Sequence, residues 1–120
     1  MPAKRDPAAP HSRYNGRRGA GGRDIKLLPA EGCDLPIPRM PPGRKWSRDE
    51  RARWRELWKS PQATQWDDSA RGTVAALIAY ETAIFDGSAS AWQAQEARYA
   101  AESLGLTPKA MHALGWRIAE

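Results

Sequence analysis

Prolines crowd one part of this chain and limit where helices can form. Proline fixes φ and disfavours helical backbone at the residue before it. Between residues 25 and 45 the chain has Pro29, Pro36, Pro38, Pro41 and Pro42. This stretch therefore predicts an extended segment. Its interspersed apolar residues predict that it lies along a surface, for which a neighbouring subunit is one hypothesis.

Residues 1–24, which precede this segment, are rich in Gly, Pro, Ala and Arg, and Tyr14 is the only aromatic residue among them. Such a composition buries too little surface to offset the entropy of ordering, so we expect a disordered basic arm. A length of 120 residues allows one domain. We assign that domain to residues 46–120.

This last part carries the start and stop signals of four helices and no convincing strand. Each predicted helix begins at residues that can cap its first turn, and most of them end at Gly or before Pro. The predicted spans are about 48–59, 68–86, 88 or 90 to 104, and 108–118. The capping residues are Ser47 with Glu50, Asp67 with Asp68, Ser90 with Gln93, and Thr107 with Pro108. The fold class is therefore an all-α bundle of about four helices, preceded by the arm and the extended segment.

Apolar residues recur at helical spacing along these helices and predict their buried faces. In the first two helices they are Trp54, Leu57, Trp58, Val74, Leu77, Ile78, Ile84 and Phe85. In the last two they are Trp92, Met111, Leu114 and Ile118. Trp46 and Trp66 flank the first helix at loop positions, where an amphipathic ring can cover an edge or enter an interface.

The sequence offers no readable active site. His11 and His112 lack a third partner with metal-ligand spacing. Cys33 is the only cysteine and has no histidine near it in sequence, which favours an inert thiol. The adjacent Asp67 and Asp68 do not share a helix face, and capping explains both. We therefore expect a protein that is not an enzyme and has neither a cofactor nor a metal site.

A single cysteine also excludes an internal disulfide framework, so we expect a reducing cytosol. No run approaches the roughly 18 apolar residues of a membrane span. No apolar run follows Lys4 and Arg5, so a secretory signal is not expected.

The net charge of +5 is distributed unevenly, with +6 in residues 1–45 and −1 in residues 46–120. A localised basic excess predicts an acidic partner, above all nucleic acid. The candidate DNA contacts in the arm are Lys4, Arg5, Arg13, Arg17, Arg18 and Arg23. Those at the first helix are Arg44, Lys45, Arg48, Arg51 and Arg55. Two plainer explanations stay open, namely that the arm is a solubilising tail and that the helix arginines pair with the interleaved Asp49, Glu50 and Glu56.

A folded part of about 75 residues has a marginal core, and association is a common remedy. Six tryptophans in so short a chain supply side chains for such contacts. We therefore expect a homo-oligomer. The candidate interface residues are Trp46, Trp66, Trp116 and Ile118.

A series of short motifs extends through the chain from residue 36 to residue 118. They are Pro36-x-Pro38-Arg39, Trp46-Ser47, Trp54, Trp58-Lys59-Ser60-Pro61, Trp66-Asp67-Asp68, Leu104-Gly105-Leu106-Thr107-Pro108 and Leu114-Gly115-Trp116-Arg117-Ile118. The series resembles the small terminase subunits of tailed phages, particularly those that infect actinobacteria. The last two motifs are its most specific part, and the resemblance covers residues 25–120.

The resemblance implies a ring-forming homo-oligomer in the cytoplasm of the bacterial host. It would bind double-stranded phage DNA at the packaging site and present that DNA to the large terminase subunit, which carries the ATPase and nuclease. Many small terminase subunits have an N-terminal helix-turn-helix domain, whereas this chain has the arm and the proline-rich segment there. Contact with the DNA backbone by the arm or the ring is therefore expected in place of base reading by a recognition helix.

Two other functions stay open. One is a non-enzymatic head-assembly or adaptor protein, whose basic arm holds an acidic protein partner. The other is a small helix-turn-helix regulator that would use the last two predicted helices, joined by the turn at Gly105–Pro108, although the last helix offers few base-reading side chains.

Overall fold

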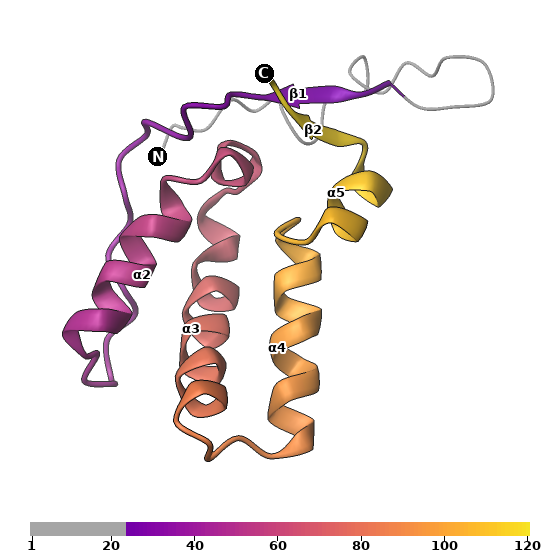
Figure 1. Cartoon of the computed structure of the whole chain (residues 1–120). Helices are drawn as coiled ribbons and strands as arrows, with labels where there is room; N and C mark the ends of the chain where they lie inside the picture. The colour runs from indigo at the N-terminus through magenta and orange to yellow at the C-terminus, as the bar shows by residue number, and fades with distance from the viewer. Residues whose placement is uncertain (1–23) are drawn as a thin grey trace.

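The computed structural model describes residues 24–120, which are mostly helical (Figure 1). The elements are β1 (Lys26–Leu28), α2 (Arg48–Trp58), η2 (Pro61–Gln65), η3 (Asp68–Ala70), α3 (Arg71–Phe85), α4 (Ala91–Ser103), α5 (Pro108–Leu114) and β2 (Trp116–Ile118). The η elements are short 3-10 helices. The mostly helical character with four α-helices confirms the coarse prediction, and the predicted arm lies almost wholly outside the described residues.

Local capping fixes where the helices begin. The side chain of Ser47 accepts a hydrogen bond from the Glu50 amide, and Glu50 accepts one from the Ser47 amide, which completes the predicted capping box of α2. Ser90 and Gln93 form the same reciprocal pair at the start of α4. At the start of α5, Thr107 accepts from the amide of Ala110. These bonds satisfy backbone donors that the first helical turn leaves unpaired.

Two predicted spans need correction. The segment predicted as one helix over 68–86 divides into η3 and α3. The last helix ends at Leu114 because Gly115 takes a left-handed φ of 77°, a conformation that stops a helix. Ile118 therefore lies on a strand, and its predicted place on a helix was wrong.

A two-stranded parallel sheet joins the two ends of the described chain, as Figure 1 shows. Lys26 pairs with Trp116 and Leu28 with Ile118. The Lys26 amide donates to the Gly115 carbonyl at 2.7 Å, and the Ala119 amide donates to the Leu28 carbonyl at 2.8 Å. The expectation that the chain has no strand was wrong, since three-residue strands leave no alternating pattern to read.

The proline-rich segment contains no helix, as predicted, but it packs on this chain's own helices. Cys33 belongs to the core cluster, and Leu35, Ile37 and Met40 pack against that cluster. The indole nitrogen of Trp54 donates to the carbonyl of Pro38 at 2.8 Å. The surface along which the segment lies is therefore supplied by the same protomer.

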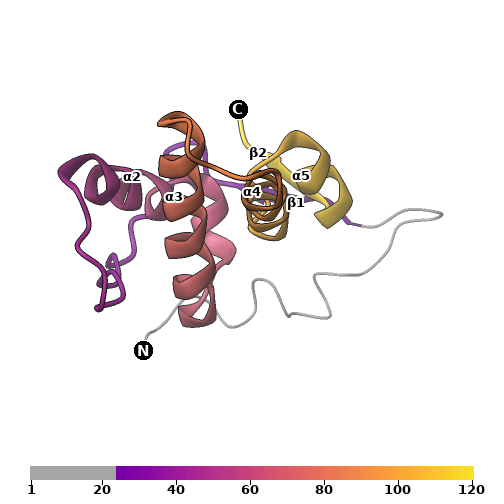
Figure 2. The same cartoon turned by 90° about the horizontal axis from the view of Figure 1, so that it is seen from below.

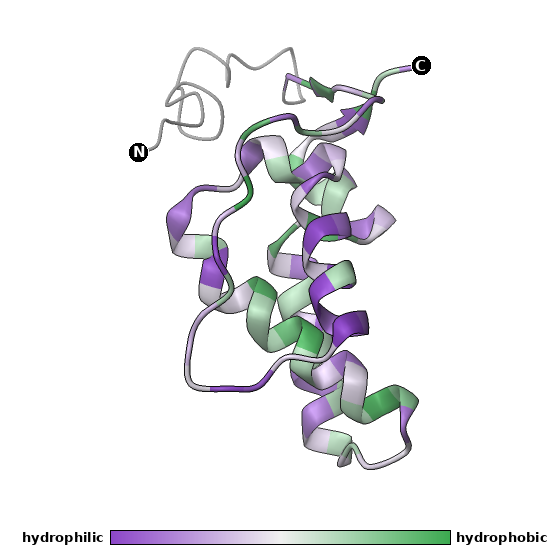
Figure 3. Ribbon diagram, turned by 90° about the vertical axis from the view of Figure 1, so that its left-hand side faces the viewer, coloured by the Kyte–Doolittle hydropathy of each residue, from purple (hydrophilic) through white to green (hydrophobic). Residues whose placement is uncertain are grey.

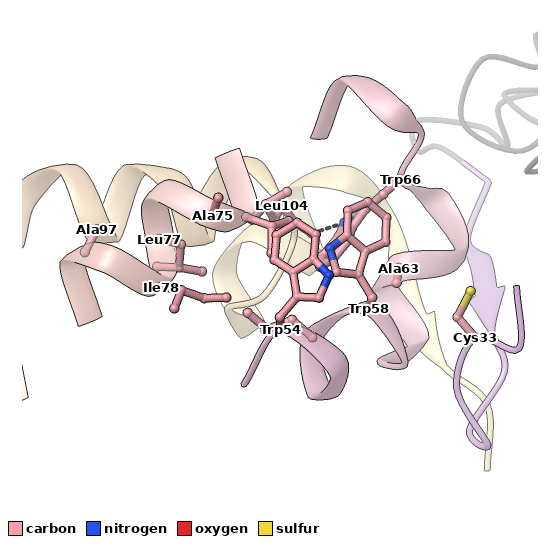
Figure 4. Packing of buried hydrophobic residues seen from close by; sticks show 12 residues of the cluster. Cys33, Trp54, Trp58, Ala63, Trp66, Ala75, Leu77, Ile78, Ala97 and Leu104 are labelled. Carbon is pink, nitrogen blue, oxygen red and sulfur yellow. Dashed lines mark hydrogen bonds between the residues drawn. The ribbon is translucent and has the colours of Figure 1, made fainter. Parts of the chain in front are cut away.

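The core gathers around three tryptophans, which Figure 4 shows from close by. The rings of Trp54 and Trp58 lie 5.6 Å apart, and those of Trp58 and Trp66 lie 5.1 Å apart in an edge-on arrangement. The Trp66 indole nitrogen donates to the Leu104 carbonyl at 2.9 Å. Buried residues of α3, among them Leu77, pack in the same cluster. Three helices lie in a row, with α3 between α2 and α4 (Figure 2).

Five residues predicted to be buried are exposed. Two of them, Leu114 in α5 and Ile118 in β2, are 44% and 37% exposed. The other three are Ile84 at 38%, Phe85 at 84% and Trp92 at 60%. These three residues lie at or near the turn between α3 and α4. This turn extends past the start of α2, and no other element of the described residues covers it (Figure 1). The ribbon at the end of α3 is coloured hydrophobic in Figure 3.

Candidate nucleic-acid interface

The helix α2 buries one side and exposes the other. Trp54, Leu57 and Trp58 are at most 3% exposed and hold the helix against the core. With 3.6 residues per turn, four basic residues form a second stripe that runs along the helix beside this buried face. We call this the basic stripe, which consists of the exposed residues Arg48, Arg51, Arg55 and Lys59. Figure 3 views the molecule from the α2 side.

The carboxylate of Glu50 is buried and is not available to the basic stripe. It accepts hydrogen bonds from Arg44 at 2.6 Å, from the Thr82 hydroxyl at 2.6 Å and from the Ser47 amide at 2.9 Å. Burial alone would raise the pKa of Glu50, but these three donors together lower it to about 2. Glu50 therefore stays ionised at neutral pH and joins α2 to α3.

Arg53 binds a second carboxylate of α2, that of Glu56, and a carboxylate of α3. It donates two hydrogen bonds to Glu81, at 3.0 and 2.9 Å, and one to Glu56 at 2.8 Å. The hydrogen bonds that Arg53 donates to Glu81 raise the pKa of Arg53 against the opposing effect of burial, so its charge is permanent. The carboxylate of Glu56 thus turns toward Arg53 on the flank of α2.

The basic stripe is left without carboxylate partners among residues 24–120. The ion pairs of this part of the chain are Arg44–Glu50, Arg53–Glu56 and Arg53–Glu81, and none involves the stripe. The guanidinium of Arg51 donates to the carbonyl of Trp46, which holds this group at the start of the helix. The alternative explanation from the sequence was that the helix arginines pair with Asp49, Glu50 and Glu56. The arginines of the stripe do not form these pairs.

The other predicted DNA contacts take different places. Arg44 is bound to Glu50, and its guanidinium lies over the Trp46 ring at 4.7 Å, so part of its donor capacity is used inside the fold. Lys45 is exposed beside the start of α2. The arm residues Lys4, Arg5, Arg13, Arg17, Arg18 and Arg23 lie outside the described residues.

The predicted interface residues serve largely inside the protomer. Trp66 is 4% exposed and belongs to the core. Trp46 is half-buried, and its indole nitrogen donates to the Pro41 carbonyl at 3.0 Å. Trp116 lies against Gly105, where an added Cβ would come within 2.1 Å of the ring. Ile118, 37% exposed in β2, is the member of the set most open to solvent.

Sequence reasoning missed Lys59, although its signal was present. Lys59 follows Arg55 by four residues, so a continued helical repeat places it on the same face. Lys59 is the last residue of the predicted span 48–59, and the arginine repeat was not continued to that position. The stripe from Arg48 to Lys59 is about 16 Å long at a rise of about 1.5 Å per residue.

Within residues 24–120, no group of three His, Cys, Asp or Glu side chains could hold a metal ion. No helix in that range is long and apolar enough to cross a membrane. His112 is exposed on α5, and Cys33 is buried. A comparison with protein families, curated proteins and solved structures finds no match to this chain.

Proposed function

We propose that this protein is a DNA-binding packaging factor without catalytic activity, the small subunit of a tailed-phage terminase. It holds double-stranded DNA through its backbone and presents that DNA to the ATPase and nuclease large subunit. It works as a homo-oligomer, a ring, in the cytoplasm of the bacterial host.

One observation carries the DNA-binding part of this proposal, namely the basic stripe of α2. The helix that carries it is held by a buried face, and the nearby carboxylates Glu50 and Glu56 are bound to Arg44 and Arg53. Exposed arginines on a fixed support neutralise phosphates and release counterions, which favours binding at low salt. The motifs that resemble small terminase subunits give the packaging role, and the basic residues of the arm add phosphate contacts.

Binding to duplex DNA over a range of salt concentrations tests the stripe. We expect the triple variant R48A/R51A/R55A to bind more weakly and to lower the slope of log K against log salt by about 0.9 per lost phosphate contact. A matched variant, R98A/K109A/R117A, removes the same charge from exposed positions on α4, α5 and β2. Equal losses in the two variants would mean that net charge acts alone and that the stripe is no interface.

The packaging role has its own test, which uses the large terminase subunit of the same phage and DNA with its packaging site. We expect the full chain to increase the amount of that DNA bound by the large subunit, and the stripe variant to do so less. No effect of the full chain on the large subunit would leave a DNA-binding protein with another role.

A further inference from the structure

One side chain ties together the start of α2 and the residues before it. The indole nitrogen of Trp46 donates to the carbonyl of Pro41 at 3.0 Å, which fixes the ring against the proline-rich segment. The Arg44 guanidinium lies over this ring, 4.7 Å from its centroid. The guanidinium of Arg51 donates to the backbone carbonyl of Trp46. Trp46 therefore holds two arginine side chains, one on its ring and one on its carbonyl.

Both guanidiniums keep donors for another acceptor. A guanidinium has five N–H donors. Arg44 uses one of them on the buried carboxylate of Glu50, at 2.6 Å, and Arg51 uses one on Trp46. The side chain of Arg44 is still 46% exposed, and Arg51 is exposed as well. We call Arg44, Trp46 and Arg51 the arginine corner.

The other cations of the basic stripe are not held in this way. Among residues 24–120, no hydrogen bond or ion pair engages the side chain of Arg48, Arg55 or Lys59. A long side chain that is free loses rotamer entropy when a ligand immobilises it, whereas one that is already held loses less. The basic surface of α2 therefore has one end of fixed geometry and a remainder whose side chains are free.

We infer that the arginine corner is the point at which the DNA backbone is held in a fixed position, with Trp46 as the positioning residue. The inference rests on the proposed function and deepens it, because it gives the cations of one surface different roles. The planar fork of a guanidinium matches a phosphate through two parallel hydrogen bonds, and this match adds geometric specificity to charge. The free cations, among them Arg48 and Arg55, contribute through counterion release.

The charges around the arginine corner favour a phosphate. Lys45 and Arg48 are exposed beside it, and the start of α2 adds the positive end of a helix dipole. Two acids also lie in the first turn of α2. The carboxylate of Glu50 is bound to Arg44, and Asp49 lines a pocket between α2 and α3 that no residue of the basic stripe lines. The corner therefore keeps its positive charge toward an approaching polyanion.

Binding of the full chain to duplex DNA, measured with charge-conserving variants, tests the inference. The variant R44K/R51K keeps both charges but loses the planar donors and the stacking on Trp46. We expect it to bind about tenfold more weakly, with an unchanged slope of log K against log salt because the number of charges is unchanged. The matched control R48K/R55K makes the same chemical change at free positions of the same helix. Its affinity should stay within about twofold of the wild type.

Two variants of Trp46 test the positioning role. Both Trp46→Phe and Trp46→Leu lose the indole donor to Pro41, but only phenylalanine keeps a ring face for the Arg44 guanidinium. We expect Trp46→Leu to bind DNA about threefold more weakly than Trp46→Phe, with the same salt slope. A purely structural role for Trp46 predicts equal losses in the two variants and overturns its assignment as the positioning residue.

Equal affinities of R44K/R51K and R48K/R55K overturn the inference, while the proposed function stands as long as the wild type binds DNA. A lower salt slope for R44K/R51K also overturns it, because the loss would then follow charge rather than geometry. A wild type that does not bind duplex DNA overturns both. Circular dichroism checks that the variants keep their helix content. If R44K/R51K does not, Arg51→Lys and Arg55→Lys repeat the comparison without disturbing Glu50, with the same expectation.

Discussion

The hydroxyl of Thr82 donates a 2.6 Å hydrogen bond to the buried carboxylate of Glu50 and so joins the last turns of α3 to the first turn of α2. The same carboxylate receives the Arg44 guanidinium and caps α2 through the Ser47 amide. Together with the buried face of α2 and the Arg53–Glu81 pair, this charged group helps to set the orientation of α2 and the direction in which the basic stripe faces.

Glu50→Gln should lower the free energy of unfolding by roughly 2–3 kcal/mol at pH 7, because the pKa of Glu50 is lowered from 4.5 to about 2. A carboxyl with a lowered pKa stabilises the fold above its unfolded pKa. The contribution is lost as the pH falls from about 4.5 to about 2. Urea denaturation of both proteins between pH 7 and pH 2 measures the difference, which should shrink over that acid range. A constant difference would show that shape and not charge is what Glu50 supplies.

Gly32→Ala should destabilise the fold far more than Gly43→Ala. Both glycines have positive φ, 92° and 98°, so both substitutions carry the same backbone strain of about 1 kcal/mol. At Gly32 the new Cβ would also lie 2.2 Å from the carbonyl oxygen of Lys59, whereas Gly43 has nothing within 4 Å. We expect a total loss of at least about 3 kcal/mol for Gly32→Ala. Equal midpoints of denaturation for the two variants would contradict the close approach of the proline-rich segment to α2.

The sequence predicted those parts of the fold that depend on neighbours along the chain. The capping boxes at Ser47 and Ser90 need only residues three positions apart, and both form. The pairing of Lys26–Leu28 with Trp116–Ile118 depends instead on how the helices between them return the chain. No local pattern carries that information, so the sheet could not be predicted.

The burial of the tryptophans also depends partly on local spacing and partly on tertiary packing. Helical spacing correctly placed Trp54 and Trp58 in the core. Trp66 is buried because η2 turns the chain back onto α2, and Trp92 is exposed because α4 meets the core through the smaller Ala97. Both outcomes depend on tertiary packing, which overrides the periodic pattern of a single helix.

Part of the candidate site could also be predicted. The spacing of Arg48, Arg51 and Arg55 placed them on one face, and the structure leaves them exposed there. Whether the interleaved acids would pair with them could not be predicted. The carboxylate of Glu50 also binds Thr82 of α3, a contact between residues 32 positions apart that no local pattern predicts.

Trp66→Phe should cost about 2–3 kcal/mol of folding free energy. The substitution removes the indole donor that binds the Leu104 carbonyl at 2.9 Å and leaves a gap among buried side chains. Trp92→Phe is the matched control, since Trp92 is 60% exposed, and should cost about 0.5 kcal/mol or less. Thermal unfolding followed by circular dichroism compares the two. A larger loss for Trp92→Phe would contradict the assignment of Trp66 to the core.

Replacement of Arg13, Arg17, Arg18 and Arg23 by alanine should weaken binding to duplex DNA and reduce its salt dependence. Each phosphate contact contributes about 0.9 to the slope of log K against log salt, so the slope should fall by up to about 3.6. Replacement of the same four residues by lysine keeps the charge and should preserve most of the slope, because counterion release depends on charge rather than on guanidinium geometry. An alanine variant with the wild-type slope would favour the solubilising tail and leave the stripe of α2 as the sole phosphate contact. A loss shared by the alanine and lysine variants would instead indicate contacts specific to the planar guanidinium.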